Sequence, residues 1–421
     1  MDRYPRQLRN VIRHSTPRRF FNLLLVELEM KLGRTKLWGR PYIAFVDPIN
    51  LCNLRCPLCP TGTNELLRAQ GTMDLHLFQH TIDEVAPWAF EITLYNWGEP
   101  LLHKNIFEMI RYAASKNLAT SISSNFNRLR PGDIDRLIDS GLEYLSVSID
   151  GASPETYAHY RRRGDFDTVL HNVRSLIERR EARGARHPIV EWQFIVMKHN
   201  EHEIDRAREL AAEVGVDLIS FVPVAMPFDF SPERKVELAP QWFSSLPGFR
   251  HADAATGWTV TKGPWRRWFS WGRQYRRQPA SDERPPTAAG ETAPRVFQSR
   301  CYHLYRSITV NPGGGVAPCC IVYDEQADTG NIREGVGNLW NNESYQSARA
   351  EFNARESPTL ETICTGCHIF AKPARLQEPV RRRSGSANGI PLPMVDAANL
   401  VGAALGRDGA TVTLPSEGGD A

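Results

Sequence analysis

Short apolar runs alternate with helical stretches between residues 42 and 225, and this alternation limits the possible folds more than any other feature. It is typical of successive βα units around a parallel sheet. The candidate strands are residues 42–46, 91–95, 119–123, 144–149, 190–197 and 218–222. Helical apolar spacing with charged opposite faces marks residues 75–85, 106–116, 166–182 and 203–214. We therefore expect an α/β fold, an incomplete (β/α)6 TIM-like barrel whose strand-end loops gather at one open end.

On this pattern the chain divides into five segments. Residues 1–40 form a basic amphipathic helical segment, and residues 41–225 form the barrel. Residues 226–300 are an insertion and linker rich in Trp, Arg and Pro. The insertion either stacks on bases and binds phosphate or, as we favour, packs its tryptophans on the core. Residues 301–375 form a small cysteine-containing domain, and residues 376–421 are a tail that we expect to be disordered.

The balance of charge gives no indication of a nucleic-acid partner. The sequence has 51 Lys and Arg against 48 Asp and Glu, a net charge of +3, so no broad basic surface is expected. The 8 cysteines, without a secretory signal at the start of the chain, indicate a reducing compartment where thiols serve metal binding or catalysis. We therefore expect the protein in the cytoplasm.

Residues 20–32 are the most apolar early stretch, but they include Glu27 and Glu29 and are too few to cross a bilayer. We expect an amphipathic helix here and no transmembrane span. The helix either makes peripheral contact with a membrane or, as we favour, packs on the core. A membrane is considered because arginines precede it, namely Arg3, Arg6, Arg9, Arg13, Arg18 and Arg19.

Three cysteines, Cys52, Cys56 and Cys59, lie in one loop directly after the first predicted strand. Thiolates at this spacing can surround one face of an iron–sulfur cubane, because a loop of this length returns each sulfur to the same point. A fourth protein thiolate is missing, so one iron stays open to an exogenous ligand. The alternatives are a zinc loop that lacks one ligand, or buried free thiols.

The Cys-x3-Cys-x2-Cys loop after the first strand of a βα series resembles the radical S-adenosylmethionine (SAM) superfamily. The resemblance implies that Cys52, Cys56 and Cys59 hold a [4Fe-4S] cluster whose open iron is chelated by the amino and carboxylate groups of S-adenosylmethionine. An electron from the cluster then breaks the bond between sulfur and C5′, and the 5′-deoxyadenosyl radical removes a substrate hydrogen. Leu58 departs from the family, which usually has an aromatic residue before the last cysteine.

Residues 97–100 follow the second strand and resemble the Gly-Gly-Glu-Pro motif of the same family, with Trp97 in place of the first glycine. The resemblance implies that Gly98 and Glu99 take the methionyl amino group, and a carboxylate beside an ammonium makes a strong charge-assisted hydrogen bond. A turn rich in Gly and Pro is the alternative.

Polar residues also end the third and fourth strands. Ser124, Asn125 and Ser148 either bind the ribose, as such positions do in related enzymes, or cap the helices that follow. Arg161 begins an Arg-Arg-Arg-Gly-Asp-Phe run that resembles a family pattern in which an arginine pairs with the methionyl carboxylate. Which of the three arginines does so is left open, with Arg161 as the candidate.

A second set of cysteines follows residue 300. It consists of Cys301, either Cys319 or Cys320, Cys364 and Cys367. Four thiolates with a terminal Cys-x2-Cys suffice for a fully ligated cluster and would also suit structural zinc. The set resembles the shortened auxiliary [4Fe-4S] domain called twitch, a truncated form of the SPASM domain. Of the two neighbouring cysteines we choose Cys319.

The resemblance implies a radical enzyme of oxidoreductase or lyase type, supplied with electrons by a donor such as flavodoxin or ferredoxin. Shortened auxiliary domains resemble those of enzymes that act on sugars and cyclitols, so we favour oxidation or rearrangement of a small polar metabolite. A SPASM-type peptide maturase is the alternative, although roughly 40 residues before the first strand are too few for its peptide-binding winged helix. A noncatalytic iron–sulfur or zinc protein is an alternative of another class.

The sequence does not identify a catalytic base. Glu191, Gln193 and His199 lie in and just after the fifth predicted strand, but these residues are too ordinary to nominate.

Overall fold

A computed structural model describes residues 3–224, 232–246, 249, 258–261, 301–353 and 356–367. Six strands pair in parallel in chain order, as predicted. They are β1 (Ile43–Val46), β2 (Glu91–Thr93), β3 (Ala119–Ser124), β4 (Tyr144–Ser148), β5 (Ile189–Val196) and β6 (Leu218–Pro223). Beyond β6 the sheet continues into the antiparallel β7 (Trp258–Thr261). The rest of the predicted insertion and the 376–421 tail lie outside the described residues, apart from α10 (Pro232–Trp242) and a few neighbours.

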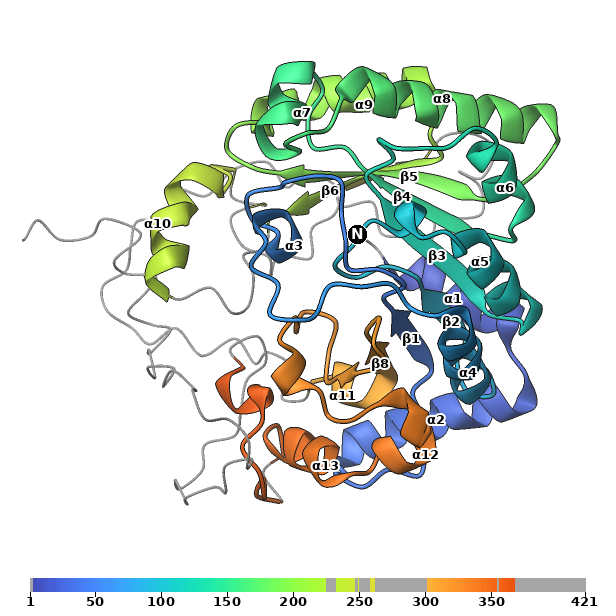
Figure 1. Cartoon of the computed structure of the whole chain (residues 1–421), viewed down its shortest axis with the longest axis vertical. Helices are drawn as coiled ribbons and strands as arrows, with labels where there is room; N and C mark the ends of the chain where they lie inside the picture. The colour runs from blue at the N-terminus through green and yellow to red at the C-terminus, as the bar shows by residue number, and fades with distance from the viewer. Residues whose placement is uncertain are drawn as a thin grey trace, which may run out of the picture.

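Figure 1 shows the sheet curving around the loop that follows β1, with helices along the outside of the curve. The helices between strands begin at side-chain caps where the sequence offers Asp or Ser, for example at Asp74, Ser153 and Asp165. They are α4 (Leu75–Val85), α5 (Ile106–Ser115), α6 (Asp133–Asp139), α7 (Pro154–Tyr160), α8 (Phe166–Ala182) and α9 (Ile204–Val214). The fold is therefore the expected incomplete barrel.

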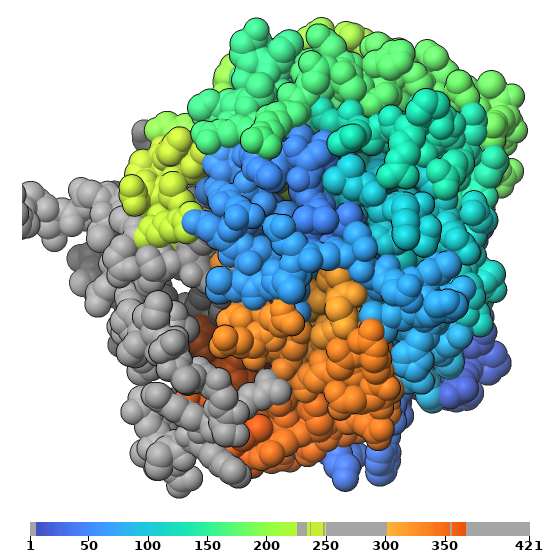
Figure 2. Space-filling model, in the orientation of Figure 1, coloured from blue at the N-terminus to red at the C-terminus, as the bar shows by residue number. Residues whose placement is uncertain are grey.

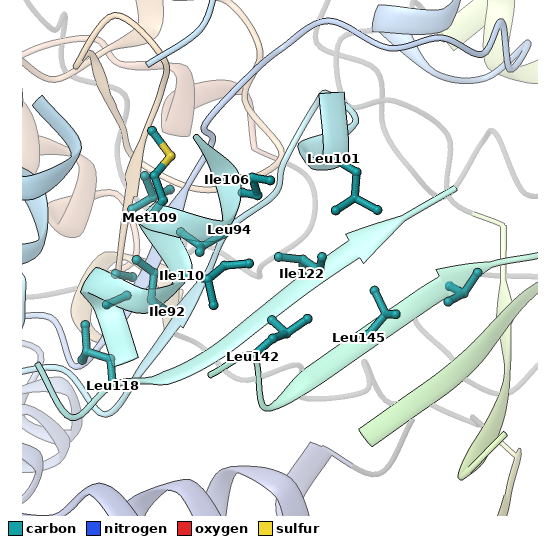
Figure 3. Close-up of a cluster of buried hydrophobic side chains, with 14 of the residues drawn as sticks. Ile92, Leu94, Leu101, Ile106, Met109, Ile110, Leu118, Ile122, Leu142 and Leu145 are labelled. Atoms are coloured by element: carbon teal, nitrogen blue, oxygen red, sulfur yellow. The ribbon is translucent and has the colours of Figure 1, made fainter. Parts of the chain in front are cut away.

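The core between α5 and the sheet shows why the apolar spacing predicted these elements. Ile106, Met109 and Ile110 of α5 are fully buried, and Figure 3 shows them against Ile92 of β2 and Ile122 of β3. Apolar residues three and four positions apart share one side of a helix, and burying that side against the sheet stabilises both elements.

Two helices precede the barrel, α1 (Arg3–His14) and α2 (Pro17–Leu32). Helix α1 contacts the starting ends of the strands, because Asn10 Nδ2 donates to Glu91 Oε2 at 2.7 Å and the Arg6 guanidinium lies 4.4 Å from the centre of the Tyr144 ring. The N-terminal segment thus packs on the barrel. No described helix is long and apolar enough to cross a bilayer.

The C-terminal unit joins the same sheet. Strand β8 (Ser307–Val310) pairs in parallel with β1, with Ile43 opposite Ser307, and β9 (Val316–Ala317) pairs with β8 in a hairpin. The remaining helical elements are α11 (His303–Arg306), η5 (Glu325–Ala327), η6 (Ile332–Glu334), α12 (Val336–Leu339), α13 (Glu343–Ala350) and η7 (Ile363–Gly366). Figure 2 shows this unit directly below the loop that follows β1.

Candidate active site

The loop after β1 brings Cys52, Cys56 and Cys59 to the carboxyl end of the strands. Cys59 precedes α3 (Pro60–Thr63), and its amide donates to the Cys56 carbonyl at 3.2 Å. Gly62 lies so close that a Cβ there would be 2.5 Å from the same carbonyl oxygen, so glycine allows α3 to close on the loop. None of the eight cysteines forms a disulfide, and all lie in the described residues.

Two of the three sulfurs face N–H donors. The Leu54 amide lies 3.4 Å and Asn125 Nδ2 lies 3.7 Å from Cys52 Sγ, and Arg161 Nη1 lies 3.8 Å from Cys56 Sγ. Such donors stabilise sulfur ligands when these are deprotonated.

The same loop is enclosed by apolar and aromatic side chains. Cys52, Cys56 and Cys59 share one cluster with Leu58, Tyr160 and Trp242 among others. Burial raises the pKa of Cys52 to about 12, with Glu99 as the next cause, and burial raises the pKa of Cys56 to about 11 against the lowering effect of Arg161. Because metals bind thiolates, loading this loop would release protons.

The chemistry of the donor set suits an iron–sulfur cubane. Within the part of the chain that the structure describes, no three His, Cys, Asp or Glu side chains are arranged to hold one metal ion. A cubane instead binds its protein sulfurs on separate irons, so the sulfurs can stand further apart. Three thiols in one loop, with N–H donors on two of them, would supply three of the four iron ligands that such a cluster needs.

Glu99 links the loop after β2 to the end of β3. Its carboxylate accepts from Ser124 Oγ at 2.8 Å and from the Asn125 amide at 2.7 Å, and Asn125 in turn reaches Cys52. Burial raises the pKa of Glu99, whereas these hydrogen bonds favour its charged form. The structure therefore brings Glu99, Ser124 and Asn125 together beside the cysteine loop.

Gly98 fixes how closely the Glu99 turn approaches that loop. A Cβ at residue 98 would stand 1.9 Å from the Ile49 carbonyl oxygen, and the Glu99 amide donates to the Leu51 carbonyl at 2.9 Å. Trp97, which replaces a glycine of the motif, packs edge-on against Tyr323 of the C-terminal unit at 5.3 Å. The departure from the motif thus has a packing role.

Of the three consecutive arginines, Arg161 reaches the cysteine loop with its side chain, whereas Arg162 reaches it through its backbone carbonyl, which accepts from the Arg55 amide at 3.0 Å. Arg161 Nε donates to Asp150 Oδ2 at 2.5 Å, whereas the side chains of Arg162 and Arg163 are exposed. Burial raises the pKa of Asp150, and Arg161 opposes that shift. Ser148 ends β4, two strands along the sheet from the β2 strand that Glu99 follows, and its Oγ lies 3.5 Å from Ser123 Oγ.

Sequence reasoning missed the roles of Asp150 and Trp242. Asp150 follows β4 at the mouth of the barrel, and its position there is the signal that could have singled it out. Trp242 comes from α10 and packs edge-to-face against Tyr160, with ring centres 5.5 Å apart. Nothing in the local pattern of the insertion indicates that contact.

The second cysteine set also converges. Burial raises the pKa of Cys319 well above its usual value, and the charges of Cys320, Cys364 and Cys301 add to the shift. Burial likewise raises the pKa of Cys301 to about 12, with Cys367 and Cys320 contributing. Residues far apart in sequence thus come within electrostatic range of one another, but both Cys319 and Cys320 belong to the group.

A cavity of about 80 Å³ lies inside the barrel. Glu191 and Gln193 of β5 line it, whereas His199 packs against His159 and Trp242 outside its lining. Glu191 accepts from Ser220 Oγ. The other polar lining residues are Arg6, Gln7, Glu91, Thr93, Tyr95, Ser121, Tyr144, Ser146, Tyr302, His303, Arg306 and Ser307.

Comparison with known proteins gives relatives for both parts of the chain. It is 34% identical over 165 residues to the AdoMet-dependent heme synthase of Methanosarcina barkeri, covering 39% of this chain and 45% of that protein. It is 24% identical over 167 residues to the mycofactocin maturase of Mycobacterium tuberculosis, covering 40% and 41%. The matches thus span less than half of these relatives. The solved structure of SuiB from Streptococcus suis matches the fold with a TM-score of 0.51 at 13% identity, over 77% of this chain and 71% of that one.

Family models match both cysteine sets. The radical SAM superfamily model matches residues 46–211, and the model of the SPASM iron-sulfur cluster-binding domain matches residues 301–368. A radical SAM domain implies a [4Fe-4S] cluster with S-adenosylmethionine, and a SPASM domain implies auxiliary iron–sulfur binding. The chain therefore contains a radical SAM domain at residues 46–211 and a SPASM-type iron–sulfur domain at residues 301–368.

Proposed function

We propose that this chain is a radical SAM enzyme that oxidises or rearranges a small polar metabolite, such as a sugar, a cyclitol or a natural-product intermediate. The bound [4Fe-4S] cluster and S-adenosylmethionine supply a 5′-deoxyadenosyl radical. Cys52, Cys56 and Cys59 hold the cluster, and the donors on Cys52 and Cys56 stabilise their thiolates.

The side chains around the loop bind and orient S-adenosylmethionine. Glu99 and the turn at Gly98 receive the methionyl ammonium, because the buried carboxylate is already held in place by Ser124 and the Asn125 amide. Arg161 pairs with the methionyl carboxylate through N–H groups that Asp150 does not use. Ser148, at the mouth of β4, takes the ribose hydroxyls.

The polar interior of the barrel supports the substrate assignment, although the cavity itself lies toward the starting ends of the strands, where Arg6 and Gln7 of α1 line it. Carboxylates, hydroxyls and an amide surround it, including Glu91, Ser121, Glu191 and Gln193. Groups of this kind bind hydroxyl-rich molecules by hydrogen bonds and would be left unpaired by an apolar ligand. Glu191 is the candidate base, since it is an acceptor in this lining.

The C-terminal cysteines would hold a second cluster, which would supply one-electron exchange with a substrate radical. Cys301, Cys319, Cys364 and Cys367 would ligate a cluster completely, which leaves it no open iron for substrate. Loss of an electron from a substrate radical gives net oxidation. A small iron–sulfur or flavin protein such as ferredoxin or flavodoxin is the expected electron donor.

A peptide maturase is the second candidate. One relative is named a mycofactocin maturase, and SuiB has been solved with its precursor peptide SuiA bound. A peptide substrate would place one side chain in the barrel cavity and the rest of its length outside it. Product analysis with peptides and polar metabolites in parallel distinguishes the two candidates.

Anaerobic reconstitution tests the proposal. With reductant and S-adenosylmethionine, the wild type should form 5′-deoxyadenosine and bind two clusters of four irons each. Cys56→Ala should abolish cleavage, because an iron loses its protein ligand. Cys320→Ala, which removes a thiol outside the loop, should keep it. A reconstituted wild type that binds iron but never cleaves S-adenosylmethionine, with candidate substrates present, would show a noncatalytic iron–sulfur protein instead.

A further inference from the structure

Helix α2 exposes large apolar side chains to solvent and buries polar side chains against the barrel. Its exposed residues include Phe21, Leu24 and Leu28, with exposed fractions of 69%, 52% and 53%. Its buried residues are Arg19, Asn22, Val26 and Glu29, of which three are polar or charged. A helix on the surface of a water-soluble protein normally shows the opposite arrangement.

Specific hydrogen bonds fix this orientation. Arg19 donates to the carbonyls of Ala86, Lys116 and Asn117 at 2.6–3.0 Å. Glu29 accepts from the amides of residues 38 and 39 at 2.8 and 3.0 Å. Turning the apolar side inward would bury these groups without partners or expose them, so the barrel holds the apolar side of α2 outward.

The apolar surface extends beyond α2. Helix α1 exposes two residues four positions apart, and a tryptophan follows α2 at residue 38 with 70% of its surface exposed. We name these exposed apolar residues of the N-terminal segment the α1–α2 face. Its residues are Leu8, Ile12, Phe20, Phe21, Leu24, Leu28, Leu32 and Trp38.

The exposed charged side chains of the N-terminal segment have one sign, although Arg13 pairs with Glu143 at 3.3 Å. Between residues 6 and 40, the exposed charged side chains are Arg13, Arg18, Lys31 and Lys36. The two acidic residues of α2 point elsewhere, because Glu29 is buried and Glu27 pairs with Arg306 at 2.6 Å. The exposed surface of the N-terminal segment thus combines large apolar groups with basic groups.

We propose that the α1–α2 face docks on the surface of a lipid bilayer that contains anionic lipids. Leu and Phe side chains would enter the boundary between headgroups and acyl chains, and the basic side chains would meet anionic headgroups. Tryptophan is enriched at this depth, which suits Trp38. Since no described helix can span a bilayer, the attachment is peripheral.

Charge favours a bilayer over a second copy of the chain. A two-fold dimer through this face would place the same basic side chains opposite one another, which repels, whereas an anionic surface attracts them. The position of the α1–α2 face on the barrel also suits docking on a bilayer. Helices α1 and α2 contact residues at the starting ends of the strands, such as Glu91 and Asn117, while the cysteine loop lies at the other end and stays accessible.

Vesicle sedimentation of the full-length protein tests the proposal. The wild type should sediment with vesicles of phosphatidylcholine and phosphatidylglycerol, less with phosphatidylcholine alone, and less again at high salt. Leu24→Glu with Leu28→Glu should weaken sedimentation about tenfold or more, because two apolar groups would no longer enter the bilayer. Lys36→Glu should weaken it less. Leu67→Glu alters an apolar residue that is 58% exposed outside this face, and it should bind as the wild type does.

Several outcomes would overturn the proposal. A wild type that stays in solution with every vesicle, or a Leu67→Glu variant that loses binding equally, would exclude a specific role for the face. A wild type that is dimeric by ultracentrifugation, binds no vesicles and becomes monomeric with Leu24→Glu would show that a second copy covers the face. Thermal unfolding of each variant confirms that the exposed substitutions leave the fold intact.

Discussion

At the scale of single residues, Gly98 decides whether the Glu99 turn can sit against the cysteine loop. An alanine there would place its Cβ 1.9 Å from the Ile49 carbonyl oxygen, so the backbone around Cys52 must move. We expect Gly98→Ala to lower both iron content and 5′-deoxyadenosine formation after reconstitution. Gly71→Ala is the matched control, because a Cβ at residue 71 meets nothing within 4 Å.

If Gly98→Ala kept full iron content and cleavage, the close contact would not position the loop. If both glycine variants lost activity equally, the effect would come from general strain rather than from the contact with Ile49. We also expect the Gly98→Ala variant to have a changed affinity for S-adenosylmethionine. Because the Glu99 turn is the proposed ammonium site, Gly98→Ala should weaken S-adenosylmethionine binding in whatever fraction of protein retains its cluster.

At the scale of elements, one ion pair joins the loop after α3 to the C-terminal unit. Arg68 donates to both carboxylate oxygens of Asp328 at 2.7 Å, and the side chains are 5% and 12% exposed. Removing one partner leaves a buried charge, so Arg68→Ala should lower the free energy of unfolding by about 3–5 kcal/mol. The Asp328→Ala variant should lose a comparable amount.

The double variant Arg68→Ala with Asp328→Ala should lose less than the sum of the two single variants, as measured by urea unfolding of each protein. Strict additivity would show that the two residues do not interact in solution. Circular dichroism before unfolding checks that each variant retains its helices.

The spacing of apolar residues predicted the helices well, because this signal lies within the helix itself. The predicted ranges 75–85 and 166–182 coincide with α4 and α8, because their apolar spacing reports the side that packs on the sheet. The pairing of β8 with β1 was beyond prediction, since nothing in either strand specifies so distant a partner. In the site, Glu99 and Arg161 followed from motifs, while the place of Trp242 beside the cysteine loop depends on how α10 folds back.

At the scale of the whole molecule, the two cysteine sets should be separable in function. Cys301→Ala should lower the iron content from two clusters to one, because the C-terminal cluster loses a ligand. It should still form 5′-deoxyadenosine, since Cys52, Cys56 and Cys59 are intact, but it should lose substrate turnover. Iron analysis and chromatography of nucleoside and product measure the three quantities. Loss of 5′-deoxyadenosine as well would show that the two sets depend on each other.

The parallel pairing of β8 with β1 has a consequence for biosynthesis. Until β8 has been made, β1 presents an open edge whose backbone groups lack the partner of the finished sheet. At about 5–20 residues per second, the ribosome needs on the order of ten seconds or more to reach β8 after β1. During that interval the nascent barrel has an unpaired strand edge at β1. We therefore expect the nascent chain to bind chaperones most before the C-terminal unit emerges.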